Sequence, residues 1–182
     1  MAIYKKCIPT SYYTSIYEID YDNLKKQGIT TLLFDLDNTI INYDETKIDV
    51  KRTEFLQELE KDFKVLIISN SKKKRVSYAV GHQFSFVSFA RKPFKVGFKK
   101  ALKKLDSKPS ETVMIGDQLM TDVFGGNRIG LKTILVEAVL RKSDKIWTRI
   151  NRKLEVYFLN KIKKKEPLKF DEILREYAKK YE

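Results

Sequence analysis

Short apolar runs that end in polar residues alternate along the chain with segments of helical periodicity. Continuous apolar runs of this length are typical of strands in a parallel sheet that is covered on both faces. Strands are predicted at residues 31–34, 65–68, 84–89, 112–115 and 133–136. Helices are predicted between them at residues 50–63, 93–105 and 120–128. This alternation predicts an α/β fold with a parallel sheet.

Two further segments flank this predicted core. Residues 1–28 are rich in tyrosine, and the basic tail carries one apolar stripe at helical spacing before Pro167 and a last helix at 171–181. The stripe consists of Trp147, Ile150, Leu154, Phe158 and Ile162. We expect this stripe to pack on the protein's own core or on a second copy of the chain, in preference to anchoring the protein in a membrane. We expect residues 1–182 to form a single domain, with an N-terminal arm over 1–28 and a helical tail over 143–182.

The composition limits the chemistry that the chain can perform. One cysteine and one histidine among 182 residues exclude an internal disulfide, a cysteine-rich zinc site and a catalytic pair of histidines. Carboxylates, hydroxyls, amides and lysines remain as the reactive groups. The 37 Lys and Arg exceed the 24 Asp and Glu by a net charge of +13, which attracts polyanions such as nucleic acid, anionic lipid or phosphorylated substrates.

The apolar runs are also too short to span a bilayer, which requires about 20 residues. The first residues lack the apolar core of a secretory signal. We therefore expect a cytoplasmic protein, and peripheral attachment at the inner face of the membrane stays open.

Polar residues of complementary types follow four of the predicted strands, and ligands bind at the carboxyl ends of strands in open α/β sheets. They are Asp35-Leu36-Asp37-Asn38-Thr39, Ser69-Asn70, Arg91-Lys92-Pro93, and Gly116-Asp117 with Asp122. Each group alone is a weak signal, but all four in this order predict one site.

This site is suited to phosphoryl transfer. Asp35 would attack phosphorus and form an aspartyl-phosphate, which splits one slow hydrolysis into two easier steps. Asp37 would protonate the leaving oxygen and then act as the base for water. Ser69 and Lys92 would hold the transferring phosphoryl oxygens. Candidates for substrate binding are Thr39, Asn70 and Arg91.

A carboxylate that approaches a phosphate dianion is repelled by it, so we expect a divalent cation between the two. Mg²⁺ prefers oxygen ligands. The predicted ligands are Asp35, Asp117 and the backbone carbonyl of Asp37, with Asp122 behind them or bound through water.

The motifs resemble those of the haloacid dehalogenase (HAD) superfamily of aspartate-nucleophile phosphatases. DLDNT is similar to the first motif of that superfamily, Ser69 to the second, Lys92 to the third and GDQLMTD to the fourth. The resemblance implies a Rossmann-like, three-layer α/β/α fold. Its five-stranded parallel sheet has the order 5-4-1-2-3, which places Asp35 beside Asp117.

Longer stretches resemble the small YqeG-type branch of that superfamily, subclass III. They are SNSKKKRV, ARKPF, GDQLMTDVFGGNRIG and TRINRKLE. Relatives in that branch are phosphatidylglycerophosphate phosphatases. The resemblance therefore implies a phosphorylated lipid headgroup as substrate, with an anionic membrane surface as a partner.

The spacing of the motifs indicates an open site, independently of the resemblance. Only 29 residues separate Thr39 from Ser69 and 22 separate Ser69 from Lys92, which leaves no room for a cap domain. An open site suits a large substrate such as a membrane lipid, a phosphoprotein or a nucleic-acid end. The basic arms favour lipid, since each Lys or Arg near an anionic leaflet contributes about 1 kcal/mol.

Other functions stay open. A nucleic-acid end phosphatase fits a basic capless surface, but nucleic acid is disfavoured because the aromatic residues cluster in the arms and the third predicted strand. A non-catalytic phospho-receiver would use similar residues in a different order. A basic binding module without activity is disfavoured by the intact acids. The oligomeric state stays open.

Overall fold

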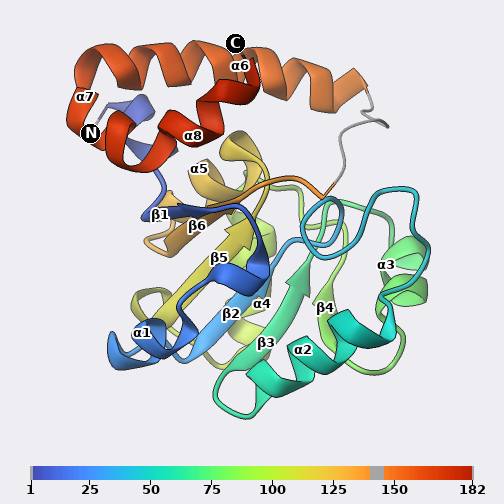
Figure 1. The fold of residues 1–182 in the computed structure, drawn as a ribbon. Helices are drawn as coiled ribbons and strands as arrows, with labels where there is room; N and C mark the ends of the chain where they lie inside the picture. Colours follow the sequence, from blue (N-terminus) through green and yellow to red (C-terminus); the bar gives the residue numbers. More distant parts are fainter. Residues whose placement is uncertain (1, 140–145, 182) are drawn as a thin grey trace.

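Six parallel strands form one sheet in a computed structural model that describes residues 2–139 and 146–181, without the side chains of 146–152 (Figure 1). The strands are β1 (Ser11–Tyr13), β2 (Thr31–Phe34), β3 (Lys64–Ile68), β4 (Ser85–Val87), β5 (Thr112–Gly116) and β6 (Lys132–Val136). The α-helices are α1 (Tyr21–Lys26), α2 (Val50–Glu60), α3 (Lys73–Val80), α4 (Lys95–Leu105), α5 (Phe124–Asn127), α6 (Ile146–Lys165), α7 (Pro167–Lys169) and α8 (Arg175–Ala178). Shorter 3₁₀ turns are η1 (Ile3–Cys7), η2 (Ile16–Glu18), η3 (Pro109–Glu111) and η6 (Lys179–Tyr181), and π-helical turns are η4 (Leu119–Val123) and η5 (Phe170–Leu174).

The predicted parallel α/β fold is confirmed, and the five predicted strands keep the order 5-4-1-2-3 among themselves. The predicted number of strands is wrong, because β1 pairs with β6 and adds a sixth strand at that edge. Its three residues are only half-buried, so they lack the apolar run by which the other strands were recognised. Part of the N-terminal arm is therefore an edge strand. The described chain between Thr39 and Lys92 contains short helices and strands and no inserted cap domain.

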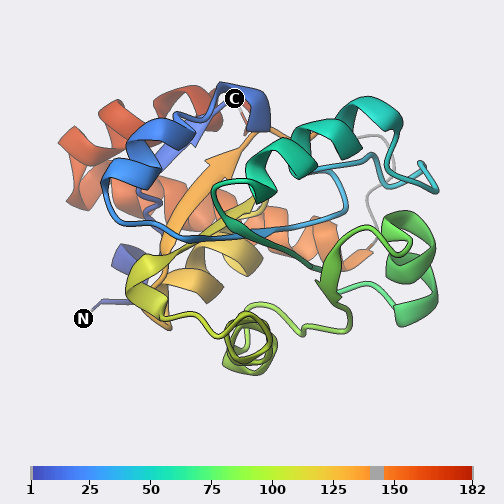
Figure 2. The same ribbon diagram turned by 90° about the horizontal axis from the view of Figure 1, so that it is seen from below.

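Helices cover both faces of the sheet, as the view in Figure 2 shows. Successive side chains of a strand point to opposite faces. Leu32 and Phe34 of β2 therefore pack with α1 and α2, whereas Leu33 packs with α4 on the other face. Side-chain caps stabilise the two helices of the first face. Asp20 accepts a hydrogen bond from the Asn23 N–H at the start of α1, and Asp49 accepts one from the Arg52 N–H at the start of α2.

The C-terminal tail packs against the β6 side of the sheet and against the first residues of the chain (Figure 1). Ile162 is buried and Phe158 packs against the same cluster, but Leu154 is 42% exposed. Glu155 occupies the buried face instead, because positions 155, 159 and 162 share one side of a helix of 3.6 residues per turn. The side chains of Trp147 and Ile150, also in the predicted stripe, lie outside the described residues. Because arm and tail share this cluster, we propose a single domain over 1–182.

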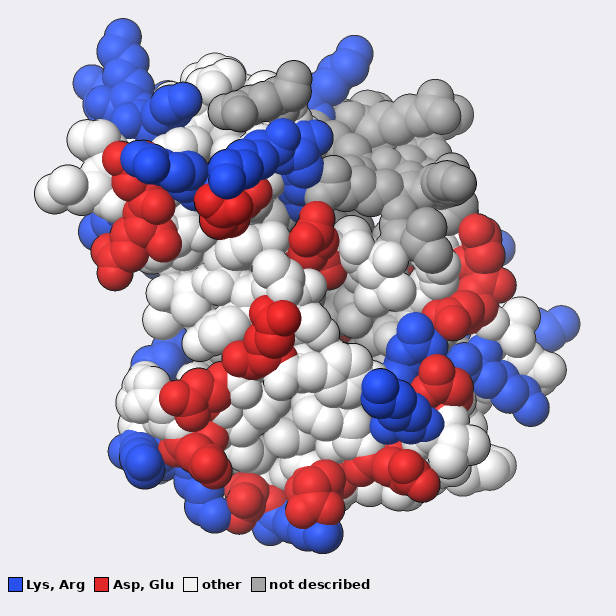
Figure 3. All heavy atoms as spheres, in the orientation of Figure 1, with Lys and Arg blue, Asp and Glu red and all other residues white. Residues whose placement is uncertain are grey.

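Charged side chains are unevenly distributed over the face drawn in Figure 3. Lys and Arg extend over the C-terminal helices at the top with Asp and Glu beside and below them, and both kinds of charge are interspersed along the lower part. The net charge of +13 is therefore not spread as one uniform positive surface. Among the described helices, none has the length and apolar character that a membrane crossing requires.

Candidate active site

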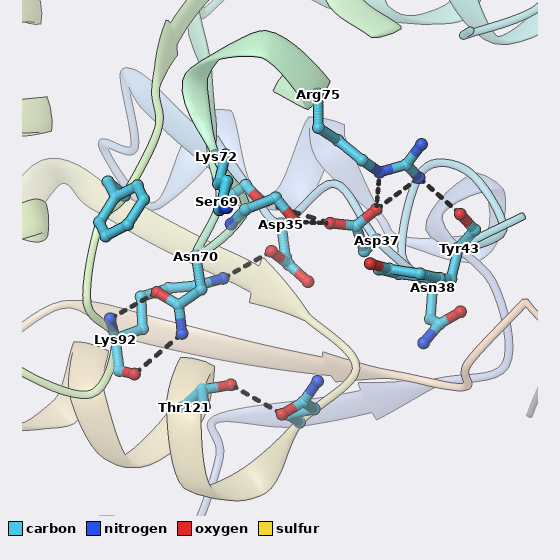
Figure 4. A pocket seen from close by; sticks show the side chains of 13 residues that line it. Asp35, Asp37, Asn38, Tyr43, Ser69, Asn70, Lys72, Arg75, Lys92 and Thr121 are labelled. Atoms are coloured by element: carbon cyan, nitrogen blue, oxygen red, sulfur yellow. Dashed lines mark hydrogen bonds and ion pairs between the residues drawn. The ribbon is translucent and has the colours of Figure 1, made fainter. Parts of the chain in front are cut away.

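The polar groups that follow β2, β3 and β5 meet at the carboxyl edge of the sheet and line one pocket of about 880 Å³ (Figure 4). Adjacent strands produce this convergence. Phe34 of β2 pairs with Ile115 of β5, and the Asp35 N–H donates to the Ile115 carbonyl at 2.9 Å. The predicted residues that line the pocket are Asp35, Asp37, Ser69, Asn70 and Lys92. After β5, Gln118 and Thr121 line it, whereas the predicted Asp117 and Asp122 are not among the lining residues.

Three buried carboxylates lie together beside one lysine. Asp35, Asp117 and Asp122 each offer an oxygen within 4.8 Å of the others. The Lys92 ammonium donates to Asp35 and to Asp122, at 2.6 Å in each case. Within the described residues, Asp117 Oδ1 is buried and has no hydrogen-bond partner. One ammonium facing three carboxylates leaves an excess of negative charge.

Burial shifts the protonation of these groups. It raises the pKa of Asp35 to about 7, against the opposing effect of Lys92 and with further repulsion from Asp122. Burial, followed by the repulsion of Asp35 and Asp122, raises the pKa of Asp117 well above its usual value. Burial alone would lower the pKa of Lys92, but the attraction of Asp122 and Asp35 outweighs it and raises that pKa.

The acidic cluster fits a divalent cation. A cation held by oxygen ligands would replace the protons that burial favours on the carboxylates. Asp117 Oδ1, which has no hydrogen-bond partner among the described side chains, could serve as a ligand atom.

Asn70 holds the backbone of Lys92. Its side-chain amide donates to the Lys92 carbonyl at 3.0 Å, and its oxygen accepts from the Lys92 N–H at 2.7 Å. The Ala90 N–H also donates to the Ser69 carbonyl at 3.0 Å. The loop after β4 is thereby tied to the end of β3, which delivers the Lys92 ammonium into the site.

Asp37 points toward Arg75 of α3 (Figure 4). Arg75 donates to Asp37 Oδ1 from Nε at 3.1 Å and from Nη2 at 2.7 Å, and Ser71 donates to Oδ2 at 2.7 Å. Arg75 Nη2 also donates to the Tyr43 carbonyl at 2.8 Å. Sequence reasoning missed Arg75, although a single arginine in the lysine run that follows Ser69 was the available signal.

Two predicted binding residues lie elsewhere. Thr39 is buried and lines a separate hollow of about 350 Å³ with Arg52 and Glu137. Arg91 is exposed and is not among the residues that line the main pocket. The structure thus does not bring these two side chains together with Asp35.

Comparisons with known proteins agree with this arrangement. A family model described as mitochondrial PGP phosphatase matches residues 1–83, and one described as HAD-hydrolase-like matches residues 89–145. The chain is 35% identical over 167 residues to a protein of Bacillus subtilis named "Probable phosphatase YqeG", which covers 91% of this chain and 96% of that one. The chain belongs to the YqeG-type branch of the HAD superfamily of phosphatases. The resemblance seen in the motifs is therefore confirmed, and the chain is a phosphatase that takes a phosphorylated substrate.

Solved structures support the HAD fold. A protein from Listeria monocytogenes serotype 4b has a TM-score of 0.50 at 22% identity, over 64% of this chain and 85% of that one. A HAD-like family hydrolase from Porphyromonas gingivalis has a TM-score of 0.51 at 13% identity, over 70% of this chain and 98% of that one. HAD phosphatases generally use a divalent metal, and the buried acidic cluster is compatible with one.

The pKa of Asp35 predicts how stability depends on pH. Its folded pKa of about 7 exceeds the ordinary value of 3.8, so the folded state binds the extra proton between these values. Without divalent metal, the free energy of unfolding should therefore fall as the pH rises from about 4 to about 7. Asp35→Asn should lose much of this fall, which amounts to a few kcal/mol at about 1.4 kcal/mol per tenfold change in proton affinity. Denaturant unfolding in EDTA at about pH 5 and about pH 8 checks this, and parallel pH dependences of the two proteins would contradict it.

Proposed function

We propose that this protein is a Mg²⁺-dependent phosphomonoesterase that removes the phosphate from phosphatidylglycerophosphate at a membrane surface, through a phosphorylated Asp35. The observation that carries the chemistry is the set of three buried carboxylates around one lysine at the ends of β2 and β5. The lipid substrate is supported by the match of residues 1–83 to the mitochondrial PGP phosphatase model.

The first half of the reaction transfers the phosphoryl group to the protein. The carboxylates of Asp35 and Asp117 and the backbone carbonyl of Asp37 would hold Mg²⁺, with Asp122 behind them. When bound, Mg²⁺ supplies positive charge against the carboxylates and the phosphate. An Asp35 oxygen attacks phosphorus, the bond from phosphorus to the lipid oxygen breaks, and Asp37 gives that oxygen a proton. Lys92 supplies positive charge to the phosphoryl oxygens.

The second half regenerates the free carboxylate. Asp37 takes a proton from water, the water oxygen attacks phosphorus, and the bond to Asp35 breaks as phosphate leaves. Arg75 and Ser71 orient the Asp37 carboxylate for both proton transfers through the hydrogen bonds described above. Ser69, 1% exposed with its hydroxyl 3.4 Å from Asp37 Oδ2, lies where it can contact the phosphoryl group.

Phosphate release with Mg²⁺ tests this proposal directly. Vesicles that contain phosphatidylglycerophosphate are expected to be the preferred substrate over phosphorylated oligonucleotides and small phosphomonoesters. Asp35→Asn should lower kcat by about 10³-fold or more on every substrate, since the nucleophile is lost. Preferred turnover of the oligonucleotides would support the nucleic-acid alternative instead, and full activity of Asp35→Asn would contradict the phosphorylated intermediate.

The rim of the pocket supports a membrane-borne substrate. Phe89 lines the pocket and is 57% exposed, and Phe94 at the end of the same loop and Val96 in the first turn of α4 are 63% and 70% exposed. The exposed Arg91 and Lys95 lie between them in the chain. Apolar side chains flanked by cations are suited to the interface of an anionic bilayer. We propose that this loop meets the membrane, which would bring the headgroup to Asp35.

Replacing Phe94 tests the contact of this loop with lipid. Phe94 is the N-cap of α4, a position that Asp favours, so Phe94→Asp should keep the helix intact. Burying a phenylalanine contributes about 1.5–3 kcal/mol, so the ratio of vesicle-borne to soluble activity should fall about tenfold or more. The matched control is Leu168→Asp on α7, which is 83% exposed, and should keep the wild-type ratio. If Phe94→Asp kept the same ratio of vesicle-borne to soluble activity as Leu168→Asp, the rim would be excluded as the lipid contact.

A further inference from the structure

The loop after β5 is held by two side chains of the C-terminal tail. Glu155 of α6 accepts a hydrogen bond from the Leu119 N–H through Oε1 at 2.8 Å. The hydroxyl of Tyr177 in α8 lies 3.2 Å from the Asp117 carbonyl oxygen and 3.2 Å from Glu155 Oε2. A phenolic hydroxyl carries a single hydrogen, which these two acceptors share. The tail thus binds the backbone at both ends of the segment from Asp117 to Leu119.

Docking of the tail does not by itself require a carboxylate. Glu155 and Tyr177 are 2% and 1% exposed, within an apolar cluster that includes Leu159 and Ile162. Burying a carboxylate is unfavourable unless it is hydrogen-bonded, and well-packed apolar residues often serve such positions equally well. The Glu155 carboxylate also accepts hydrogen bonds from the hydroxyls of Tyr177 and Tyr181 within the tail, and its bond to the Leu119 N–H is the one that reaches the loop.

The backbone of this loop determines where the Asp117 carboxylate lies. Asp35 and Asp122 are each held by an ion pair with Lys92. Asp117 Oδ1, in contrast, is buried with no hydrogen-bond partner among the residues that the structure describes. Its place in the cluster thus depends on the backbone. Asp122 accepts from the Gln118 N–H at 3.1 Å within the cluster, and Glu155 and Tyr177 bind the same backbone from the tail.

We propose that Glu155 and Tyr177 are positioning residues of the divalent-metal site, which hold residues 117–119 so that the Asp117 carboxylate meets Asp35 and Asp122. The proposal rests on the proposed function for the identity of the metal. It makes the tail a part of the active site, although Tyr177 lies 60 residues beyond Asp117 in the chain.

Binding of Mg²⁺ to purified, full-length variants tests the proposal without turnover. Removing a partner that orients a metal ligand typically weakens metal binding about 10–100-fold. We expect a rise of that size in the Mg²⁺ dissociation constant for Glu155→Leu, measured by calorimetry, and a smaller rise for Tyr177→Phe. Glu155→Gln keeps an oxygen for the Leu119 N–H and should restore most of the binding. Ile162→Val removes one methylene from the same cluster and is the control for weakened packing.

Amide hydrogen exchange without metal provides a second readout. The Leu119 amide should exchange faster in Glu155→Leu than in Ile162→Val, because its acceptor is lost. If the wild type binds no Mg²⁺, the proposed function fails, while faster exchange still supports the hold on the loop. If Glu155→Leu does not fold, the Mg²⁺ dissociation constant of Tyr177→Phe takes its place in the binding measurement. Wild-type Mg²⁺ affinity in the foldable variants, together with unchanged exchange over residues 117–123, would overturn the proposal.

Discussion

Among the described residues, one buried ammonium group faces three buried carboxylates at the carboxyl edge of the sheet, and the proposed chemistry depends on this charge imbalance. Lys92 forms ion pairs with Asp35 and Asp122, whereas Asp117 Oδ1 has no hydrogen-bond partner in the part of the chain that the structure describes. Burial and mutual repulsion raise the pKa of Asp35 and of Asp117, which disfavours the ionised form of both side chains. The cluster is compatible with a divalent cation, which would offset this negative charge and, in the proposed reaction, make Asp35 available to an anionic substrate.

The surrounding fold is arranged to keep this cluster together. The pairing of β2 with β5 places Asp35 beside Asp117, and Asn70 ties the Lys92 loop to the end of β3. Separate contacts orient Asp37 toward Arg75. The acids are thereby divided into two groups, one suited to a metal and one suited to proton transfer.

The predictable parts of the site were those encoded next to a strand. Asp35, Ser69 and Asp117 follow apolar runs that can be recognised locally, and parallel strands bring such ends to one edge. Arg75 and Glu155 act through tertiary packing of helices, so their neighbours in sequence do not reveal their partners. One feature of the sequence does point to Glu155, because its spacing to Leu159 and Ile162 places it on the buried side of the helix. The predicted apolar stripe contains Leu154 instead. Strand β1 was missed because its pairing with β6, and not an apolar run, defines it.

The most direct test of the central claim is to locate the metal in crystals grown with Mn²⁺ in place of Mg²⁺, by anomalous diffraction. The account predicts one ion bound by carboxylate oxygens of Asp35 and Asp117, with the Lys92 ammonium released from Asp35 or shared with the substrate phosphate. An empty cluster in which Lys92 still bridges Asp35 and Asp122, or an ion bound elsewhere on the protein, would contradict it.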